Sequence, residues 1–373
     1  KTGRQILASK TSFHLIKLES ISSRAANLLK QEMLGIGADA GIKKEIASFD
    51  VKKSDILLMG TESQYKKLIP RLKRQPFGLA TIASQLKQAL NNFEQRKFVI
   101  SLRDKKLDLR KKVAVMGVLN VTPDSFYDGG RYIEQDKALR RVESMIKEGA
   151  DLIDIGGEST RPGAKRVGTD EELQRVIPVI SEIRKFFDIL ISVDTYKADV
   201  AREAIETGAN LINDISGLRF DSELKKVIAK YDVPVVIVHI KGTPGNMQNN
   251  PQYECLMGEI TSYLRNSIKI AEEAGISPDK IIVDPGIGFG KTTEHNLEII
   301  RRLGELKSLG KSILIGASRK SFIGNILKLP LSERLEGSLA IASLSVFQGA
   351  HIIRTHDVKE TRRALDITKA IMQ

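Results

Sequence analysis

Cysteine, tryptophan and long apolar runs are scarce or missing in this chain of 373 residues. Cys255 is the only cysteine and there is no tryptophan. A single cysteine excludes an internal disulfide and fits the reducing cytoplasm, where we expect the protein to work. No apolar run approaches the roughly 20 residues that cross a bilayer, and no signal-peptide core follows Lys1. With 41% apolar and 28% charged residues, the composition predicts a globular protein that does not span a membrane.

Negative charge is scarce in the first third of the chain. Residues 1–112 carry 24 basic and 10 acidic residues, a net charge of +14, whereas the rest carry 35 and 36, a net charge of −1. A basic appendage on a neutral body requires a role of its own. Three roles are open: a packing or dimerisation domain with solvated lysines, a nucleic-acid-binding module, and electrostatic guidance of an anionic substrate. We favour the first and do not expect nucleic acid as a partner, because four phenylalanines are expected in the core rather than on a stacking platform: Phe13, Phe49, Phe77 and Phe93.

The N-terminal third is predicted to form a small α+β domain over residues 1–108. Its pattern predicts two strands, at Phe13–Leu18 and Asp55–Gly60, and a helix over 24–34 capped by Ser23. Two further helices are predicted over 62–74 and 79–93. The charged stretch Arg103–Lys112 is interpreted as a linker to the next domain.

Short apolar runs alternate regularly with amphipathic helical stretches from Val113 to the end of the chain. Continuous Val, Ile and Leu runs are typical of parallel strands buried on both faces. Eight such units within residues 109–373 predict an α/β fold, a (β/α)₈ TIM barrel. A doubly wound open sheet is the alternative, but it needs a glycine-rich turn after its first strand, which is absent here. The predicted strands are Val113–Asn120, Leu152–Gly156, Leu190–Asp194, Leu211–Asp214, Val235–His239, Ile281–Asp284, Ile313–Gly316 and Ile352–His356.

Polar or ionisable residues follow every one of these runs. In a barrel the strand ends converge on one face, where active sites of this fold lie. Arg354 and His356 are two residues apart on the last strand, so they face the same way and favour an anion site. Two other patterns do not predict a site. The segment before Lys291 resembles a phosphate-binding loop, but Pro285 stands where that loop needs glycine. Three histidines, His239, His295 and His351, lack the spacing of metal ligands and are expected to have structural roles.

Several motifs in family order resemble those of dihydropteroate synthases, over about residues 109–373. They are Met116–Phe126 with Asp128–Gly130, Asp154–Gly163, Ser192–Lys197, Asn213–Ile215, Asp284–Lys291, Ser318–Ser321 and Arg354–Asp357. Ile240 departs from the methionine that is frequent in the family. Together these motifs are specific. The resemblance implies a transferase of folate biosynthesis that condenses 6-hydroxymethyl-7,8-dihydropterin diphosphate with p-aminobenzoate and releases diphosphate, usually with Mg²⁺. It also implies sensitivity to sulfonamides, and we expect a homodimer.

The resemblance also assigns roles to individual residues. It makes Asp194, Lys320, Arg354 and His356 catalytic. The pterin is assigned to Asp194, Asn213, Ile215, Asp284, Phe289, Gly316 and Lys320, and the diphosphate to Asn120, Ser159, Thr160, Arg354 and His356. The p-aminobenzoate pocket is assigned to Phe126, Arg161, Pro162 and Ser321, and the metal to Asn120. A carboxylate suits the pterin because it accepts two adjacent N–H donors of an amino-pyrimidinone edge. The alternative reading of Asp194 and Asp284 is that they cap helices.

A methyltetrahydrofolate:corrinoid methyltransferase is the competing enzyme class, because it shares a pterin-binding barrel. Such an enzyme has no need of the Thr160–Gly163 loop, Lys320 or the Arg354 and His356 pair, which suit diphosphate chemistry. We therefore favour the synthase. None of the motifs lies in residues 1–108, so catalysis is not expected to require them.

Overall fold

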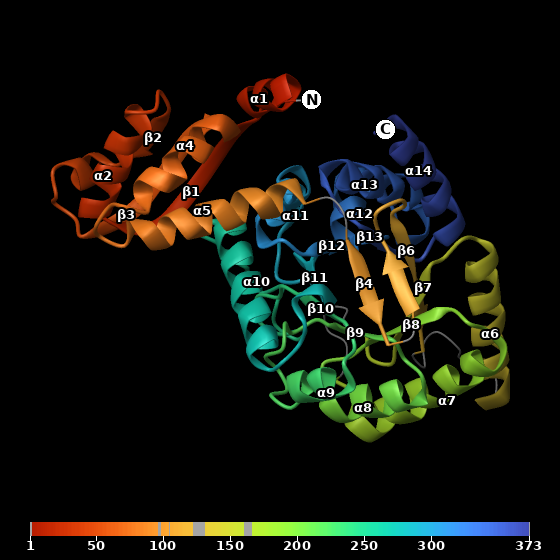
Figure 1. Cartoon of the computed structure of the whole chain (residues 1–373). Helices are drawn as coiled ribbons and strands as arrows, with labels where there is room; N and C mark the ends of the chain where they lie inside the picture. Colours follow the sequence, from red (N-terminus) through yellow and green to blue (C-terminus); the bar gives the residue numbers. More distant parts are fainter. Residues whose placement is uncertain (1, 96–97, 104, 122–130, 160–165, 373) are drawn as a thin grey trace. The chain divides into compact units, whose positions relative to one another are not determined.

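The chain folds into two compact units, Lys1–Glu94 and Gln95–Gln373, which are described separately. The computed structural model describes residues 2–95, 98–103, 105–121, 131–159 and 166–372 (Figure 1). Within these ranges no helix is long and apolar enough to cross a membrane.

The N-terminal unit is the small α+β domain expected from the sequence. Its three strands form an antiparallel sheet in the order β1-β3-β2. Ile56 and Leu58 of β3 are buried against Leu29 and Leu68 of the helices, so the helices cover one face of the sheet. The elements are α1 (Thr2–Thr11), β1 (Phe13–Ser22), α2 (Ser23–Leu34), β2 (Asp39–Ile42), α3 (Lys44–Ala47), β3 (Lys53–Thr61), α4 (Glu62–Leu72) and α5 (Leu79–Glu94).

Two expectations for this unit were wrong. The cap of α2 is Ser22, whose hydroxyl accepts from Ala25 N, while Ser23 is already helical. The four phenylalanines are exposed rather than buried, with 60%, 60%, 51% and 38% of their surface accessible at Phe13, Phe49, Phe77 and Phe93. Phe13 points away from the helices, because β1 alternates between a covered and an uncovered face. Phe49 and Phe77 lie in turns with φ of 65° and 61°.

The second unit is a closed barrel of eight parallel strands, as the sequence predicts. The strands lie in the order β10-β11-β12-β13-β6-β7-β8-β9, and β9 pairs with β10 to close the ring. Four of them have the predicted bounds and the other four differ by at most one residue at an end. They are β6 (Ala114–Asn120), β7 (Leu152–Gly156), β8 (Leu190–Asp194), β9 (Leu211–Asp214), β10 (Val235–Val238), β11 (Ile281–Asp284), β12 (Ser312–Ile315) and β13 (Ile352–Thr355).

Amphipathic helices surround the barrel (Figure 1). Their apolar sides pack with the outward-facing strand residues in one core, which includes Val179 and Ile183 of α7 and Ile153 of β7. The helices are α6 (Arg131–Lys147), α7 (Thr169–Phe186), α8 (Ala198–Thr207), α9 (Leu224–Tyr231), α10 (Leu256–Glu273), α11 (Thr293–Arg301), α12 (Ser321–Leu327), α13 (Leu335–Gln348) and α14 (Val358–Ile371). Short 3₁₀ helices span Pro278–Lys280, Leu303–Leu309 and Leu331–Glu333.

A β-hairpin closes the barrel end where the strands begin. It consists of β4 (Val99–Leu102) and β5 (Lys105–Asp108), paired antiparallel. Its buried Ile100, Leu102 and Leu107 belong to one apolar cluster with inward-facing strand residues such as Leu152 and Leu211. The stretch interpreted as a linker is therefore partly a strand of the hairpin, and the barrel unit begins at Gln95 rather than Leu109.

Candidate active site

The opposite end of the barrel interior is lined by ionisable and amide side chains. On β8 and β9 the last inward-facing positions are Asp194 and Asn213, which are register partners. Asp284 ends β11 and is 6% exposed. Because parallel strands all end on the same side, these groups converge on one face, as expected for a barrel enzyme.

Arg354 of β13 bridges two carboxylates across this interior. Its Nε donates to Asp154 Oδ2 at 2.6 Å, and its Nη2 donates to Asp194 Oδ2 at 2.9 Å. Asn213 Nδ2 donates to the same oxygen of Asp154 at 3.0 Å. The four side chains from β7, β8, β9 and β13 thus form one buried network.

Burial and the ion pairs act in opposite directions on this network. Burial raises the pKa of Asp194 above its ordinary value, and the Arg354 guanidinium opposes that rise. Burial alone would lower the pKa of Arg354, but Asp154 and Asp194 outweigh it and raise the value. Arg354 is therefore fully charged, and it supports negative charge on both carboxylates.

Asp284 stabilises the turn that follows β11 through one of its carboxylate oxygens. Its Oδ1 accepts from Gly286 N at 2.6 Å, while burial raises the pKa of its carboxyl group. Neither Asp284 nor Asp194 caps a helix, because the caps of α11 and α8 are Thr292 and Lys197. The helix-cap reading is therefore wrong for both residues.

Lys320 lies at the N-terminus of α12 and points toward the loop after β11. Its Nζ donates to Ile287 O and lies 4.4 Å from the centre of the Phe289 ring. Burial lowers the pKa of Lys320 to about 8, and the nearby Asp284 limits that fall. Gly288 must be glycine here, because its φ is +81° and an added Cβ would lie 3.1 Å from Lys320 Cδ.

Two further residues predicted to bind the pterin, Ile215 and Gly316, offer it no polar side chain. Ile215 is 3% exposed and follows β9 directly. An added Cβ at Gly316 would lie 3.6 Å from Arg354 Cβ and Cδ, an ordinary contact distance, so this position lies directly against the Arg354 side chain. Both residues thus border the network of Arg354.

His356 lies next to Arg354's strand end and is held by the neighbouring loop. Its backbone N and its Nδ1 are 3.2 Å and 3.1 Å from Ser318 Oγ. The adjacent residues Arg319 and Asp357 form a two-point ion pair, with 2.9 Å between Nε and Oδ2. This ion pair joins the loop that carries Lys320 to the turn that carries His356.

Asn120 is the residue assigned to the metal. It ends β6 and is half-buried, and an added Cβ at Gly156 would be 3.8 Å from Asn120 Oδ1 and 3.9 Å from Asp194 Oδ2. An amide oxygen and a carboxylate oxygen therefore border the same space, and both are hard ligands that suit Mg²⁺. Among the described residues, no three His, Cys, Asp or Glu side chains gather as a metal cage. A single protein ligand is still adequate, because Mg²⁺ commonly keeps substrate phosphates and waters.

Several predicted residues lie outside the described part of the chain: Phe126, Thr160, Arg161 and Pro162. Ser159 is described and half-buried, and Ser321 is exposed in the first turn of α12. The residues that flank 160–165 are anchored by Glu158, which accepts from Lys197 Nζ at 2.6 Å and from Val167 N at 3.4 Å.

The sequence analysis did not predict Asp154 as a site residue, and it gave Lys291 no role. Asp154 is fully buried in an otherwise apolar strand, and that position is itself a signal, because a buried carboxylate needs a partner. Lys291 is 3% exposed and lies 2.8 Å from His239 Nδ1. That pairing joins segments far apart in the chain and has no sequence signal.

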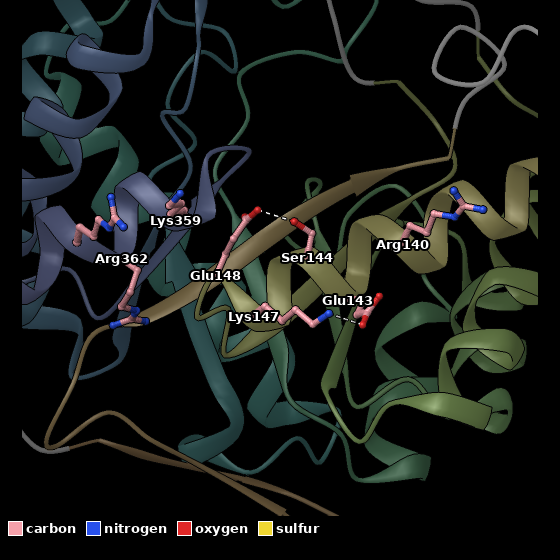
Figure 2. A pocket seen from close by; sticks show the side chains of 8 residues that line it. Arg140, Glu143, Ser144, Lys147, Glu148, Lys359 and Arg362 are labelled. Carbon is pink, nitrogen blue, oxygen red and sulfur yellow. Dashed lines mark hydrogen bonds and ion pairs between the residues drawn. The ribbon is translucent and has the colours of Figure 1, made fainter.

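Two surface cavities differ in their position relative to this network: the first lies away from it and the second lies beside it. One of about 630 Å³ lies between α6 and α14, and Figure 2 shows its charged lining, which contains none of the predicted residues. Its acids are already engaged, since Glu148 accepts from Ser144 at 2.6 Å and Glu143 from Lys147 at 2.5 Å. A second cavity, of about 470 Å³, is lined by His356, Arg319 and Asp357 among others and borders the site. The barrel end is therefore the candidate active site.

Comparisons with known proteins identify the family of the barrel unit. Residues 116–356 match the family of pterin-binding enzymes. The dihydropteroate synthase of Clostridium beijerinckii is 46% identical over 275 residues, which are 74% of this chain and the whole of that protein. The structure of Yersinia pestis dihydropteroate synthase in a sulfonamide drug complex has a TM-score of 0.70 and 45% identity, and covers 74% of this chain and 99% of that one.

A third relative extends over the N-terminal unit. The probable bifunctional folylpolyglutamate synthase/dihydropteroate synthase of Halobacterium salinarum is 38% identical over 360 residues, which are 96% of this chain and 43% of that protein. The identity to dihydropteroate synthases over nearly their whole length decides between the two enzyme classes left open by the sequence. The chain belongs to the dihydropteroate synthase family.

Proposed function

We propose that this chain condenses 6-hydroxymethyl-7,8-dihydropterin diphosphate with p-aminobenzoate at the C-terminal end of its barrel. The observation that carries the proposal is the network of Asp154, Asp194 and Arg354, next to Asp284 and Lys320. It combines acceptors for a pterin edge with a buried cation for a diphosphate. A test is diphosphate release with both substrates and with each omitted in turn. Release that does not depend on p-aminobenzoate would contradict the proposed condensation.

The pterin ring is the substrate part that the buried acids recognise. Asp284 accepts the adjacent N–H donors of the amino-pyrimidinone edge, and Asn213 supplies both a donor and an acceptor. Lys320 donates to the ring carbonyl, and Phe289 lies against the ring. In this role Lys320 exchanges its bond to Ile287 O for one to the substrate.

The diphosphate binds beside the ring, next to Arg354 of β13 and to His356, which follows that strand. Ser159 and Thr160 add hydroxyl donors, and Asn120 would hold a Mg²⁺ ion, which would balance the remaining negative charge. The metal would hold the leaving oxygens and stabilise their charge.

The reaction breaks one bond and forms one. The C–O bond between the pterin methylene and the diphosphate breaks, and the electron pair leaves with the diphosphate. The cation that remains is delocalised into the pterin, where the Asp194 carboxylate stabilises it. The p-aminobenzoate nitrogen then forms the C–N bond and loses a proton to water. The protein mainly positions the groups and stabilises charge.

The p-aminobenzoate pocket is proposed to comprise Phe126, Arg161, Pro162 and Ser321. Ser321 lies directly after Lys320, so this pocket adjoins the pterin. Sulfonamides are expected to compete with p-aminobenzoate in the presence of pterin diphosphate. Noncompetitive inhibition would place the drug elsewhere.

We also propose that the enzyme forms a homodimer through α13 and α14. These helices pack against each other and expose large apolar side chains, with 64% of Phe347 and 66% of Ile367 accessible. A monomeric soluble protein rarely exposes such neighbours together. Light scattering should give twice the chain mass, and Phe347→Asp should give the monomer. A wild-type monomer would contradict this proposal.

The N-terminal unit is proposed to bind a folylpolyglutamate synthase. Its sheet is uncovered on one face, where Leu15 and Met59 are register partners next to Phe13 and Leu57. Leu15 is 64% exposed, so this face offers an apolar surface to a partner. The Halobacterium relative, which aligns with nearly the whole chain, is a probable fusion with folylpolyglutamate synthase. We therefore propose that a folylpolyglutamate synthase binds this face of the sheet.

Co-elution of the full chain with purified folylpolyglutamate synthase tests this role. Leu15→Asp/Leu57→Asp should abolish co-elution and leave diphosphate release unchanged. Leu34→Asp, at an exposed position of α2, is the control and should co-elute. Equal co-elution of both variants, or none with the wild-type chain, would contradict the proposal.

A further inference from the structure

A buried lysine supports the glycine-rich loop between β11 and α11. Lys291 is 3% exposed, and its Nζ donates to Phe289 O at 2.9 Å and to His239 Nδ1 at 2.8 Å, with His239 O at 3.5 Å. The N–H donors of its amino group thus face three acceptor atoms. Burial lowers the pKa of Lys291 well below its ordinary value, and Asp284 opposes that fall. Its stem ends inside the protein, out of reach of solvent.

His239 must be neutral to take part in this contact. Burial and the nearby Lys291 lower the pKa of His239 well below its ordinary value. Its Nδ1 then accepts a hydrogen bond from Lys291 Nζ, and its Nε2 carries the hydrogen. A histidine for which the sequence predicted a structural role is thus the specific partner of a buried lysine.

The loop that Lys291 holds has little freedom to move. At Gly286 an added Cβ would lie 1.9 Å from His239 O, and at Gly290 one would lie 2.4 Å from Lys241 O. The chain therefore passes directly against the backbone that follows β10. Tyr253 and Gln248 also donate to loop carbonyls, at Gly290 O and Gly288 O, at 2.8 Å and 2.6 Å.

The same loop holds two groups of the pterin site. Ile287 O accepts from Lys320, and the Phe289 ring lies under the Lys320 ammonium at 4.4 Å. Lys291 binds the carbonyl of Phe289 itself, so a shift of the lysine moves that ring and the support of Lys320 together. A displacement of about 1 Å at such groups is enough to reduce catalysis strongly.

We propose that Lys291, held by His239, is a positioning residue that fixes Phe289 and Lys320 for pterin binding. The inference rests on the proposed pterin substrate. It gives Lys291, which is not proposed to contact the substrate, a part in pterin binding. It also gives His239 a part, because His239 holds Lys291 in place.

Substitution of each partner separates positioning from simple core stability. Lys291→Met keeps the apolar stem and removes the amino group that donates to Phe289 O, so KM for the pterin diphosphate should rise at least tenfold. KM for p-aminobenzoate should stay within about twofold, since the described contacts of Lys291 are with His239 and Phe289. His239→Leu should have the same effect, whereas His239→Asn, which retains an acceptor oxygen, should keep most of the wild-type affinity.

The double variant Lys291→Met/His239→Leu removes both side chains of the 2.8 Å contact, so neither is left without the other and part of the lost stability should return. Its affinity for 6-hydroxymethylpterin should nevertheless stay at least tenfold below wild type. Lys280→Met is the matched control, because Lys280 is also buried, binds Asp232 at 2.6 Å and lies at the opposite end of β11. It should lower the melting temperature without changing pterin affinity.

Wild-type pterin affinity in Lys291→Met, or its recovery in the double variant, would overturn the inference. So would equal rises in KM for both substrates. If Lys291→Met does not fold, the comparison of His239→Leu with His239→Asn decides by the same criteria. Failure of the proposed function would look different, because the wild-type chain itself would then release no diphosphate when both substrates are present.

Discussion

Arg354 and Asp154 are 200 residues apart in the chain and form an ion pair inside the barrel, with 2.6 Å between Nε and Oδ2. The other oxygen of Asp154 is buried and accepts no hydrogen bond from the described residues. The ion pair with Arg354 therefore offsets the cost of burying the Asp154 carboxylate. Arg354 has a structural duty in addition to its proposed contact with diphosphate.

Arg354→Met is expected to lower both stability and substrate affinity. Removal of one partner of a buried ion pair costs roughly 3–5 kcal/mol, and Asp154→Asn/Arg354→Met should regain much of that loss in urea unfolding. Both variants should bind the pterin diphosphate at least tenfold more weakly, with a smaller loss for 6-hydroxymethylpterin. Equal losses for the two ligands, measured by calorimetry, would separate Arg354 from the diphosphate.

Asp284→Asn should weaken pterin binding while the fold persists. The substitution places an N–H donor opposite a ligand donor, and an unsatisfied buried polar group costs roughly 1–3 kcal/mol. We therefore expect at least a tenfold loss of affinity for 6-hydroxymethylpterin. Asp279→Asn, near the beginning of the same strand, is the control and should bind normally. Asp284→Asn with wild-type affinity would remove Asp284 from the pterin site.

Pterin affinity should depend on pH through Lys320. Burial lowers the pKa of Lys320 to about 8, and Asp284, Arg354 and Asp194 are the charged groups that act on it. The ammonium is present below that pKa and is lost as the pH rises through it, so affinity should fall in alkaline solution. Lys320→Arg keeps its charge there and should bind without this fall.

The affinity for 6-hydroxymethylpterin should be measured for both proteins from about pH 6.5 to about pH 9.5. This interval brackets the lowered pKa of Lys320 and lies below the pKa of an ordinary lysine. The ligand's own ionisation is common to both proteins and cancels in their ratio. A constant ratio over this interval would show that Lys320 does not titrate there.

The barrel strands were predictable because of how parallel strands are buried. Runs such as Leu152–Gly156 are covered on both faces and so are apolar throughout, and each ends where polar residues meet solvent or substrate. The hairpin was missed for the opposite reason. Lys105 and Lys106 begin a strand in which only Leu107 is buried, and a charged stretch of this kind looks like a linker.

The internal pairing of the site could not be predicted in the same way. The sequence motifs predicted Asp194, Asp284 and Lys320 as individual residues, but not which carboxylate Arg354 binds. The contact between Lys291 and His239 likewise depends on two loops meeting at the barrel end. Similarly, hydrophobicity alone placed Phe13 in the core, although its strand has helices on one face only.

The closing hairpin predicts how far the chain can be shortened. Ile100, Leu102 and Leu107 are 1%, 2% and 6% exposed in the apolar cluster of the barrel interior. Each such side chain contributes roughly 1.5–3 kcal/mol, against a total stability of roughly 5–15 kcal/mol. Residues 95–373 should therefore fold and retain the wild-type rate of diphosphate release, whereas residues 109–373 should melt at a much lower temperature or not fold.

Thermal unfolding and diphosphate release of the two shortened chains test this prediction together, with the full chain as the reference. Ile100→Asp in the full chain should reproduce the loss of stability, because it places a charge in the same cluster. Equal melting temperatures for 95–373 and 109–373 would mean that the hairpin does not close the barrel. A well-folded 95–373 chain that binds no pterin would instead assign the N-terminal unit a part in the active site, since the barrel and its hairpin would both be intact.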